Sequence, residues 1–223
     1  MTTWALHNRS QLLITASSGE SSGFTFGTDQ QSVDAWWFTK PINYNYRAFV
    51  HLHDAYSEFP EGDANRQRTG VGTEYRSGPW TARGELSFDR EYSELGVTGD
   101  LNWRYSDRWQ LDAQIAQNST DMPMRGYRVE VESNSVSLAA TMTQSESLIY
   151  SFGTRYADFT DGNRYQAFYG NMYRRLLTRP RSLTHLTAEL FTGSNSRQDV
   201  NYYAPERDLS AMVGVEHRWR IRR

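Results

Sequence analysis

The residues of this chain that could carry out chemistry are few, and their spacing does not favour an enzyme. His51 and His53 stand two positions apart, a spacing that can bind a metal ion, but no third ligand is evident nearby. Asp100 and Asp112 could form a carboxylate pair, although nothing in the sequence sets their separation. The serine-rich run at 133–137 has no G-x-S-x-G context, and the glycines at 70–72 fall inside a strand and lead to no helix. We therefore predict no catalytic residue, no metal site and no cofactor.

The composition excludes further classes of protein. The net charge of −2 over 223 residues gives no electrostatic support for binding nucleic acid. Cysteine is absent, which removes disulfides and thiolate chemistry. No run of about 18 apolar residues predicts a transmembrane helix. The aromatic content is high, with 7 Trp, 14 Tyr and 10 Phe, and this is typical of a β-barrel whose aromatic residues lie at the membrane–water interfaces.

Apolar and polar residues alternate with a period of two, which predicts β-strands with one apolar face. Leu86 and Phe88 alternate with Glu85 and Asp89, for example, and similar patterns follow. We expect about twelve strands, near 9–16, 33–39, 44–54, 66–76, 80–89, 95–104, 109–115, 134–142, 147–157, 164–177, 182–192 and 207–220. Many of these are as long as a tilted strand that crosses a bilayer.

The predicted links alternate between long and short, as they do in barrels of the outer membrane. The long links are expected at 17–32, 57–65, 90–94, 118–133, 158–163 and 193–206. The tryptophans stand near the ends of their segments, where an aromatic girdle is expected: Trp4, Trp36, Trp37, Trp80, Trp103, Trp109 and Trp219. We predict an all-β, antiparallel up-and-down transmembrane β-barrel. The alternative is a soluble sandwich or lipocalin-like barrel, in which the apolar faces point inward.

If the apolar faces meet lipid, the alternate positions line a polar lumen. We expect this lumen to contain Glu74, Glu85, Asp89, Asp100, Asp112, Glu189, Arg47, Arg83, Arg104 and Arg155. These charges could simply neutralise one another around a water-filled interior. They could also form a track for a sugar chain, with many weak contacts that do not stall the polymer. Phe49, Phe168 and Tyr202 are candidates for stacking on sugar rings.

Five collinear stretches resemble the C-terminal barrel of the PgaA-type poly-N-acetylglucosamine export porins. They are "NYRAFVHLHDAYSEFPEG" (45–62), "VGTEYRSGPWTARGE" (71–85), "DMPMRG" (121–126), "RYADFTDGNRY" (155–165) and "NSRQDVNYYAPERD" (195–208). The resemblance implies a sixteen-stranded barrel in the outer membrane of a Gram-negative bacterium. It also implies export of a partly deacetylated exopolysaccharide, contact with outer-membrane lipid, and a periplasmic deacetylase recruited by a TPR region.

The sequence departs from that family pattern in two respects. No TPR region is found, and the chain ends in "HRWRIRR" (217–223) after about twelve strands, without a terminal aromatic residue. We interpret residues 1–223 as a fragment of the barrel domain that lacks about four strands. A natural short variant is the alternative. We expect a polysaccharide exporter; the alternative functions are a general porin or structural barrel and, with less support, an outer-membrane enzyme.

Overall fold

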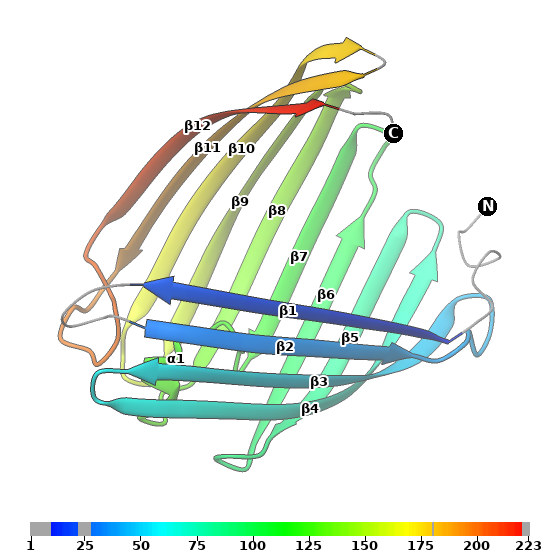
Figure 1. The fold of residues 1–223 in the computed structure, drawn as a ribbon. Coiled ribbons are helices and arrows are strands. Elements are labelled where there is room, and N and C mark those ends of the chain that lie inside the picture. The colour runs from blue at the N-terminus through cyan, green and yellow to red at the C-terminus, as the bar shows by residue number, and fades with distance from the viewer. Residues whose placement is uncertain (1–9, 22–27, 180, 220–223) are drawn as a thin grey trace.

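The computed structural model describes residues 10–21, 28–179 and 181–219, and these form one antiparallel sheet whose strands follow chain order. Residues 118–132, which join two of these strands, contain a short helix, α1 (Met124–Tyr127). The strands are β1 (Gln11–Ser21), β2 (Thr28–Phe38), β3 (Tyr46–Phe59), β4 (Gly62–Ser77), β5 (Trp80–Asp89), β6 (Glu94–Trp103), β7 (Trp109–Gln117), β8 (Ser133–Ser145), β9 (Leu148–Phe159), β10 (Arg164–Arg179), β11 (Ser182–Asn195) and β12 (Asp208–Trp219) (Figure 1). The twelve strands that the sequence predicts are confirmed.

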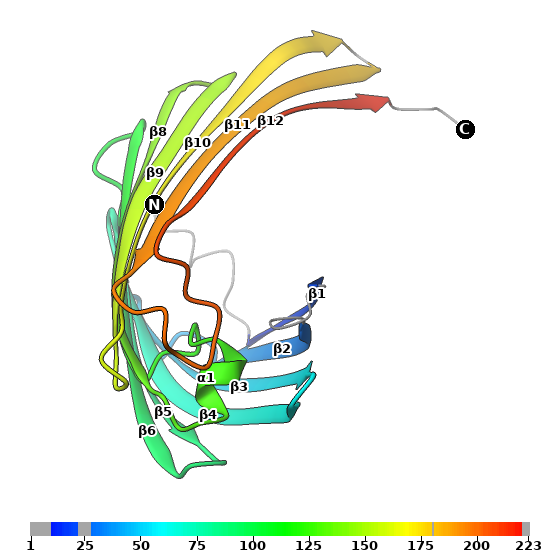
Figure 2. The same cartoon turned by 90° about the vertical axis from the view of Figure 1, so that its left-hand side faces the viewer.

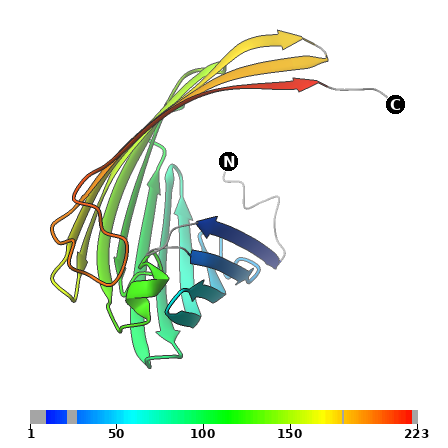
Figure 3. The same ribbon diagram turned by 60° about the vertical axis from the view of Figure 1, so that its left-hand side comes forward.

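The sheet curves strongly, and its two edge strands lie apart. Figure 2 shows β1 and β12 on either side of an opening, and no pairing joins them among the described residues. Figures 2 and 3 place α1 on the concave side of the sheet. Within the described residues, no helix is long and apolar enough to cross a membrane. The structure is thus a barrel wall with one open side.

The two faces of the sheet differ in the way that a membrane barrel requires. On the convex face, Leu52, Leu86 and Leu101 expose 51%, 51% and 40% of their surface. On the concave face, Glu74 and Asp89 are fully buried. A soluble sandwich buries its apolar face, so this arrangement is the reverse of the soluble alternative. It confirms the predicted orientation, with the apolar face outward and the charged face inward.

Tight turns set the register at several points. Gly78 and Pro79 join β4 to β5, and the φ of +54° at Gly78 is one that glycine adopts without steric cost. On the opposite end, Pro60 and Glu61 join β3 to β4, followed by Gly62 at φ +136°. The long link predicted over 57–65 is therefore wrong, because both strands continue through most of it. The predicted order of long and short links fails at this point.

Two links at that same end are long and fold inward. Residues 118–132, between β7 and β8, carry α1, and residues 196–207 join β11 to β12. They contribute Met124, Tyr127 and Tyr202 to a buried apolar cluster that includes Phe59 of β3. This cluster fills one side of the concave face at the end with the long links. The link at 22–27, together with Trp4, lies outside the described residues.

Gly72 allows a close approach between β4 and its neighbours. A Cβ atom at this position would lie 2.3 Å from the ring of Phe49 and 2.3 Å from the backbone oxygen of Gly84. The backbone oxygen cannot move aside without distorting the pairing of β4 with β5. We therefore expect Gly72→Ala to destabilise the barrel by about 1–3 kcal/mol, the usual cost of overpacking.

The measurement is urea unfolding of the full-length protein in lipid vesicles. Gly84→Ala is the matched control, since a Cβ atom at Gly84 has no neighbour within 4 Å. Equal stability of the two variants would contradict the close packing described at Gly72.

Candidate functional site

Glu74 is the centre of a buried charge cluster on the concave face. Its register partners are Arg47 on β3 and Arg83 on β5, so strand pairing brings both guanidinium groups to the carboxylate. Arg47 donates from Nε at 3.0 Å, and Arg83 donates from Nε at 2.6 Å. Arg76, two positions along β4, lies 2.8 Å from the same carboxylate. Three cations thus surround one anion that is completely buried.

Asp89 holds a second cluster nearer the end with the long links. Arg66 donates from Nε to the Asp89 carboxylate at 2.8 Å, and the guanidinium of Arg68 lies 3.5 Å from it. The Tyr127 hydroxyl, from α1, donates to Asp89 at 2.6 Å. Burial, together with this hydrogen bond, raises the pKa of Tyr127, so its hydroxyl remains a donor. Asp89 therefore joins the sheet to the inward-folded link rather than facing open space.

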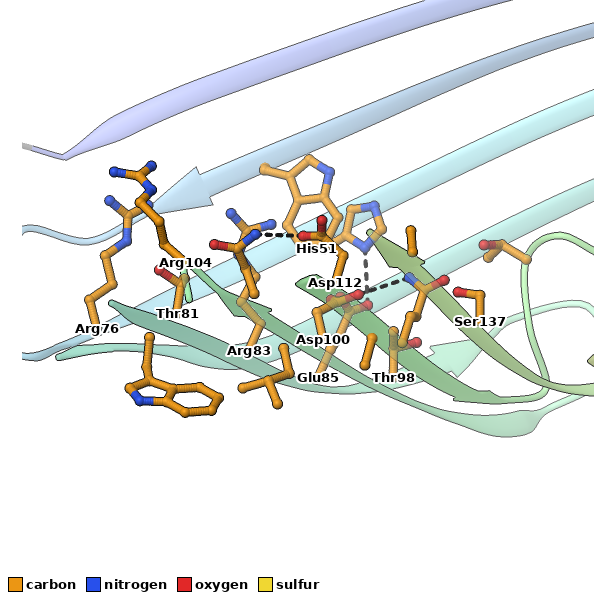
Figure 4. Close-up of a pocket in the computed structure, with 18 of the residues that line it drawn as sticks. His51, Arg76, Thr81, Arg83, Glu85, Thr98, Asp100, Arg104, Asp112 and Ser137 are labelled. Atoms are coloured by element: carbon orange, nitrogen blue, oxygen red, sulfur yellow. Dashed lines mark hydrogen bonds and ion pairs between the residues drawn. The ribbon is translucent and has the colours of Figure 1, made fainter. Parts of the chain in front are cut away.

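Asp100 and Asp112 differ from these two carboxylates because neutral amides hold them. Asp100 on β6 accepts from Gln114 at 2.8 Å, across the β6–β7 pairing. Asp112 accepts from Asn102, its register partner, and from Gln110 at 3.2 Å. Both are half-buried and line a cavity of about 1050 Å³ on the concave face (Figure 4). Their negative charge is thus presented to this cavity.

His51 connects two further carboxylates along the same cavity. Its Nδ1 lies 3.0 Å from Glu85, and its Nε2 lies 3.1 Å from Asp34. His53 contacts the same oxygen of Asp34 at 2.8 Å. Among the described residues, no group of three or more potential ligands is arranged to hold a metal ion. The two histidines instead bind carboxylates on neighbouring strands.

The other predicted lumen residues are dispersed. Arg104 is exposed and lines the same cavity as Asp100. Arg155 on β9 forms an ion pair at 3.0 Å with Asp121 of the inward-folded link. Glu189 is exposed on β11, opposite Asn171 of β10. The ten predicted residues thus fall into the two buried clusters and the cavity, while Arg155 and Glu189 lie farther away.

The aromatic residues that face the cavity are not those expected from the sequence. Phe49 is only 2% exposed and packs under other inner-face rings, and Tyr202 is buried in the apolar cluster. Phe168 lies on the convex face with 47% exposed, which places it away from the lumen. Trp36, assigned to the girdle, lines the cavity instead and stacks on His51 at 3.7 Å. The sequence pattern could have predicted this position, because Trp36 alternates with Asp34 and Phe38 along β2 and therefore lies on the same face of the sheet.

The fold and this inner face define a transmembrane β-barrel. The sequence matches the PgaA membrane beta barrel domain over residues 6–223, and the chain belongs to that family, which makes it a protein of the Gram-negative outer membrane. Relatives from Escherichia coli strain K12 and strain O157:H7, both named poly-beta-1,6-N-acetyl-D-glucosamine export protein, are each 24% identical over 95% of this chain. The chain spans 26% of the length of these relatives.

A solved structure has the same fold. It is described as a bacterial polysaccharide outer membrane secretin, and it superposes with a TM-score of 0.85 at 21% identity, over 97% of this chain and 74% of the other. The relatives are named for export and the solved structure as a secretin, in agreement with the prediction that this protein is not an enzyme.

The Glu74 cluster gives a prediction about stability. Glu74→Gln leaves three guanidinium groups around a neutral side chain in a fully buried site. Breaking a buried ion pair by removing one partner costs about 3–5 kcal/mol. We expect a loss of that size in urea unfolding of the full-length protein in lipid vesicles.

Glu189→Gln serves as the control, since it removes the same charge from an exposed position on β11. We expect that variant to change stability by less than about 0.5 kcal/mol. If both substitutions lowered the free energy of unfolding by a similar, small amount, the Glu74 cluster would contribute little to stability.

Proposed function

We propose that this chain forms the wall of a passive outer-membrane export channel for a polysaccharide, with partly deacetylated poly-N-acetylglucosamine as its substrate. The observation that carries the proposal is the difference between the inner-face charges. The arginines Arg47, Arg66 and Arg83 bind buried carboxylates, whereas Asp100 and Asp112 have amide partners and line the cavity. The cavity wall therefore offers anionic positions to a passing ligand.

This arrangement suits a polymer that carries some free amines. Deacetylation of an N-acetylglucosamine unit leaves an amine that is positively charged near neutral pH, and a carboxylate attracts it. Asp100 and Asp112 are partly exposed, so solvent screens the attraction and each contact stays weak. Repeated weak contacts allow a chain to move from site to site without being trapped.

Neutral parts of the sugar chain also find partners in the cavity. Asn102, Gln114 and Ser137 line it together with the two aspartates, and they supply amide and hydroxyl groups. The ring of Trp36 adds a flat, largely apolar surface beside these polar groups. Such a mixture of polar groups and an aromatic ring suits pyranose units, which have hydroxyl edges and less polar faces.

Three further parts of this proposal concern what surrounds the channel. The exposed apolar side chains of the convex face contact outer-membrane lipid. The free edges of β1 and β12 pair with additional strands in the complete barrel, because unpaired strand edges are unsatisfied within a bilayer. A TPR region of the full-length protein recruits a periplasmic deacetylase.

Neutralising the two amide-held aspartates tests the proposed function. In full-length protein carrying Asp100→Asn and Asp112→Asn, we expect export of the partly deacetylated polymer to fall about tenfold, because the weak anionic sites that attract its amines are lost. Uptake of a small neutral dye should persist, since the volume of the cavity hardly changes. Polymer in the culture medium and dye influx are measured on the same cells.

The control removes the same charge from Asp54 and Glu58, as Asp54→Asn with Glu58→Gln. Both lie on β3 at positions that alternate with its inner-face residues, so their side chains are on the convex face. Both are exposed. Unchanged export after the Asp100 and Asp112 substitutions would argue for a general porin, and so would equal losses in both double variants.

A further inference from the structure

The link 118–132 is fixed to the concave wall by buried polar contacts. Arg66 is fully buried and donates to Asn118 Oδ1 at 2.8 Å and to the Ser119 carbonyl at 3.0 Å. Arg68 donates to the Asn118 carbonyl at 2.6 Å. Further along the link, Tyr127 donates to Asp89, as described above. Contacts at the start of the segment and in α1 thus hold it against β4 and β5.

Packing closes one side of this link. Met124 and Tyr127 are 4% and 3% exposed, and they pack with Phe59 of β3 and Tyr202 of the 196–207 link. Figure 2 shows α1 against the inner side of β3 and β4, with the β11–β12 link beside it. A polymer cannot pass through this packed cluster.

The other side of the link is open. A cavity of about 350 Å³ lies between residues 120–124 and the inner face of β2 and β3. It is lined by polar side chains of the two strands, namely Gln30, Ser32, Asp34 and His53. Asp34 and Thr120 line both this cavity and the larger one at the centre of the concave face. The two spaces therefore meet at this pair of residues.

The end with the long links is the extracellular end in outer-membrane barrels. We propose that Asp34 and Thr120 form the exit constriction of the channel at this end, a subsite that takes one short segment of an amine-bearing hexosamine chain. This proposal rests on the proposed export function and adds the route by which the polymer leaves. The small cavity lies at the lower end of the range for small-molecule sites, so it accepts an extended strand and not a coiled one.

Asp34 has the geometry to contact an ammonium group at this point. Both histidines contact its Oδ1, His51 at 3.1 Å and His53 at 2.8 Å. The second oxygen, Oδ2, has no partner among the described contacts, and the side chain is 32% exposed. A carboxylate oriented by two histidines thus has one oxygen available for a ligand in the passage. Thr120, exposed on the opposite wall, adds a hydroxyl.

Chemical labelling of a folded channel tests the route. The chain has no cysteine of its own, so Thr120→Cys in the full-length protein provides a specific position for a bulky maleimide added to intact cells. Glu130→Cys is the control, because Glu130 is exposed on the same link and lines neither cavity. Each variant is compared with itself before and after labelling, and mass spectrometry measures the extent of labelling.

In the Thr120→Cys variant, we expect labelling to reduce polymer export about tenfold, because the label occupies a constriction. Labelling at position 130 should leave export within about twofold of the unlabelled value. Complete labelling at position 120 without loss of export would overturn the proposed route, and so would failure of the reagent to reach that position. Absence of export from the wild-type protein would instead refute the proposed function.

A charge substitution tests the ligand class. We expect Asp34→Asn to reduce export of the partly deacetylated polymer about threefold or more, and to leave export of a fully acetylated polymer nearly unchanged. The second polymer is produced in cells that lack the deacetylase. Asp29→Asn removes the same charge from the opposite face of β2 and should affect neither polymer. Equal losses for both polymers in Asp34→Asn would show that Asp34 does not recognise the amine.

Discussion

The alternation of side chains along each strand is the constraint on which this structure depends. Because the convex face is apolar, the charged residues at alternate positions must lie on the concave face, where curvature brings them together. Glu74 shows the consequence, since strand pairing places Arg47 and Arg83 on either side of it. Buried ions need partners with good geometry, and the register supplies them. The same alternation that suits the lipid thus determines which charges meet.

The concave face then divides into regions with different physical roles. Around Glu74 and Asp89, each buried carboxylate binds two or three arginines, and these clusters hold the wall and the 118–132 link together. Around Asp100 and Asp112, neutral amides hold the carboxylates at the edge of an open cavity. A fully paired charge has little left for a ligand, whereas an amide-held carboxylate retains its net charge. The difference in pairing leaves Asp100 and Asp112 as anionic positions on a cavity wall that also carries arginines.

Much of the wall was predictable, because period-two patterns report strands and faces directly. The alternation predicted strands as long as β5 and β6 and placed Asp100 and Asp112 on the inner face. It did not predict the turn at Pro60 and Glu61, where polar residues that resemble a loop continue the strands. The alternation also could not predict contacts between residues that come together only in the folded structure. Nothing in the sequence distinguishes Asp89, paired with Arg66, from Asp112, held by amides, or shows that residues 118–132 fold inward.

The anchoring of that inward link bears on the proposed export route. Detaching it from the wall would remove two of the three acceptors of Arg66 and expose Met124 and Tyr127 to water. Disruption of a buried charged network costs about 3–5 kcal/mol, so the detached state would be populated roughly a hundredfold less, or lower still. A link held so firmly acts as part of the wall. For the proposed export route, this means that fixed strands, and not a moving loop, set the width of the passage beside the link.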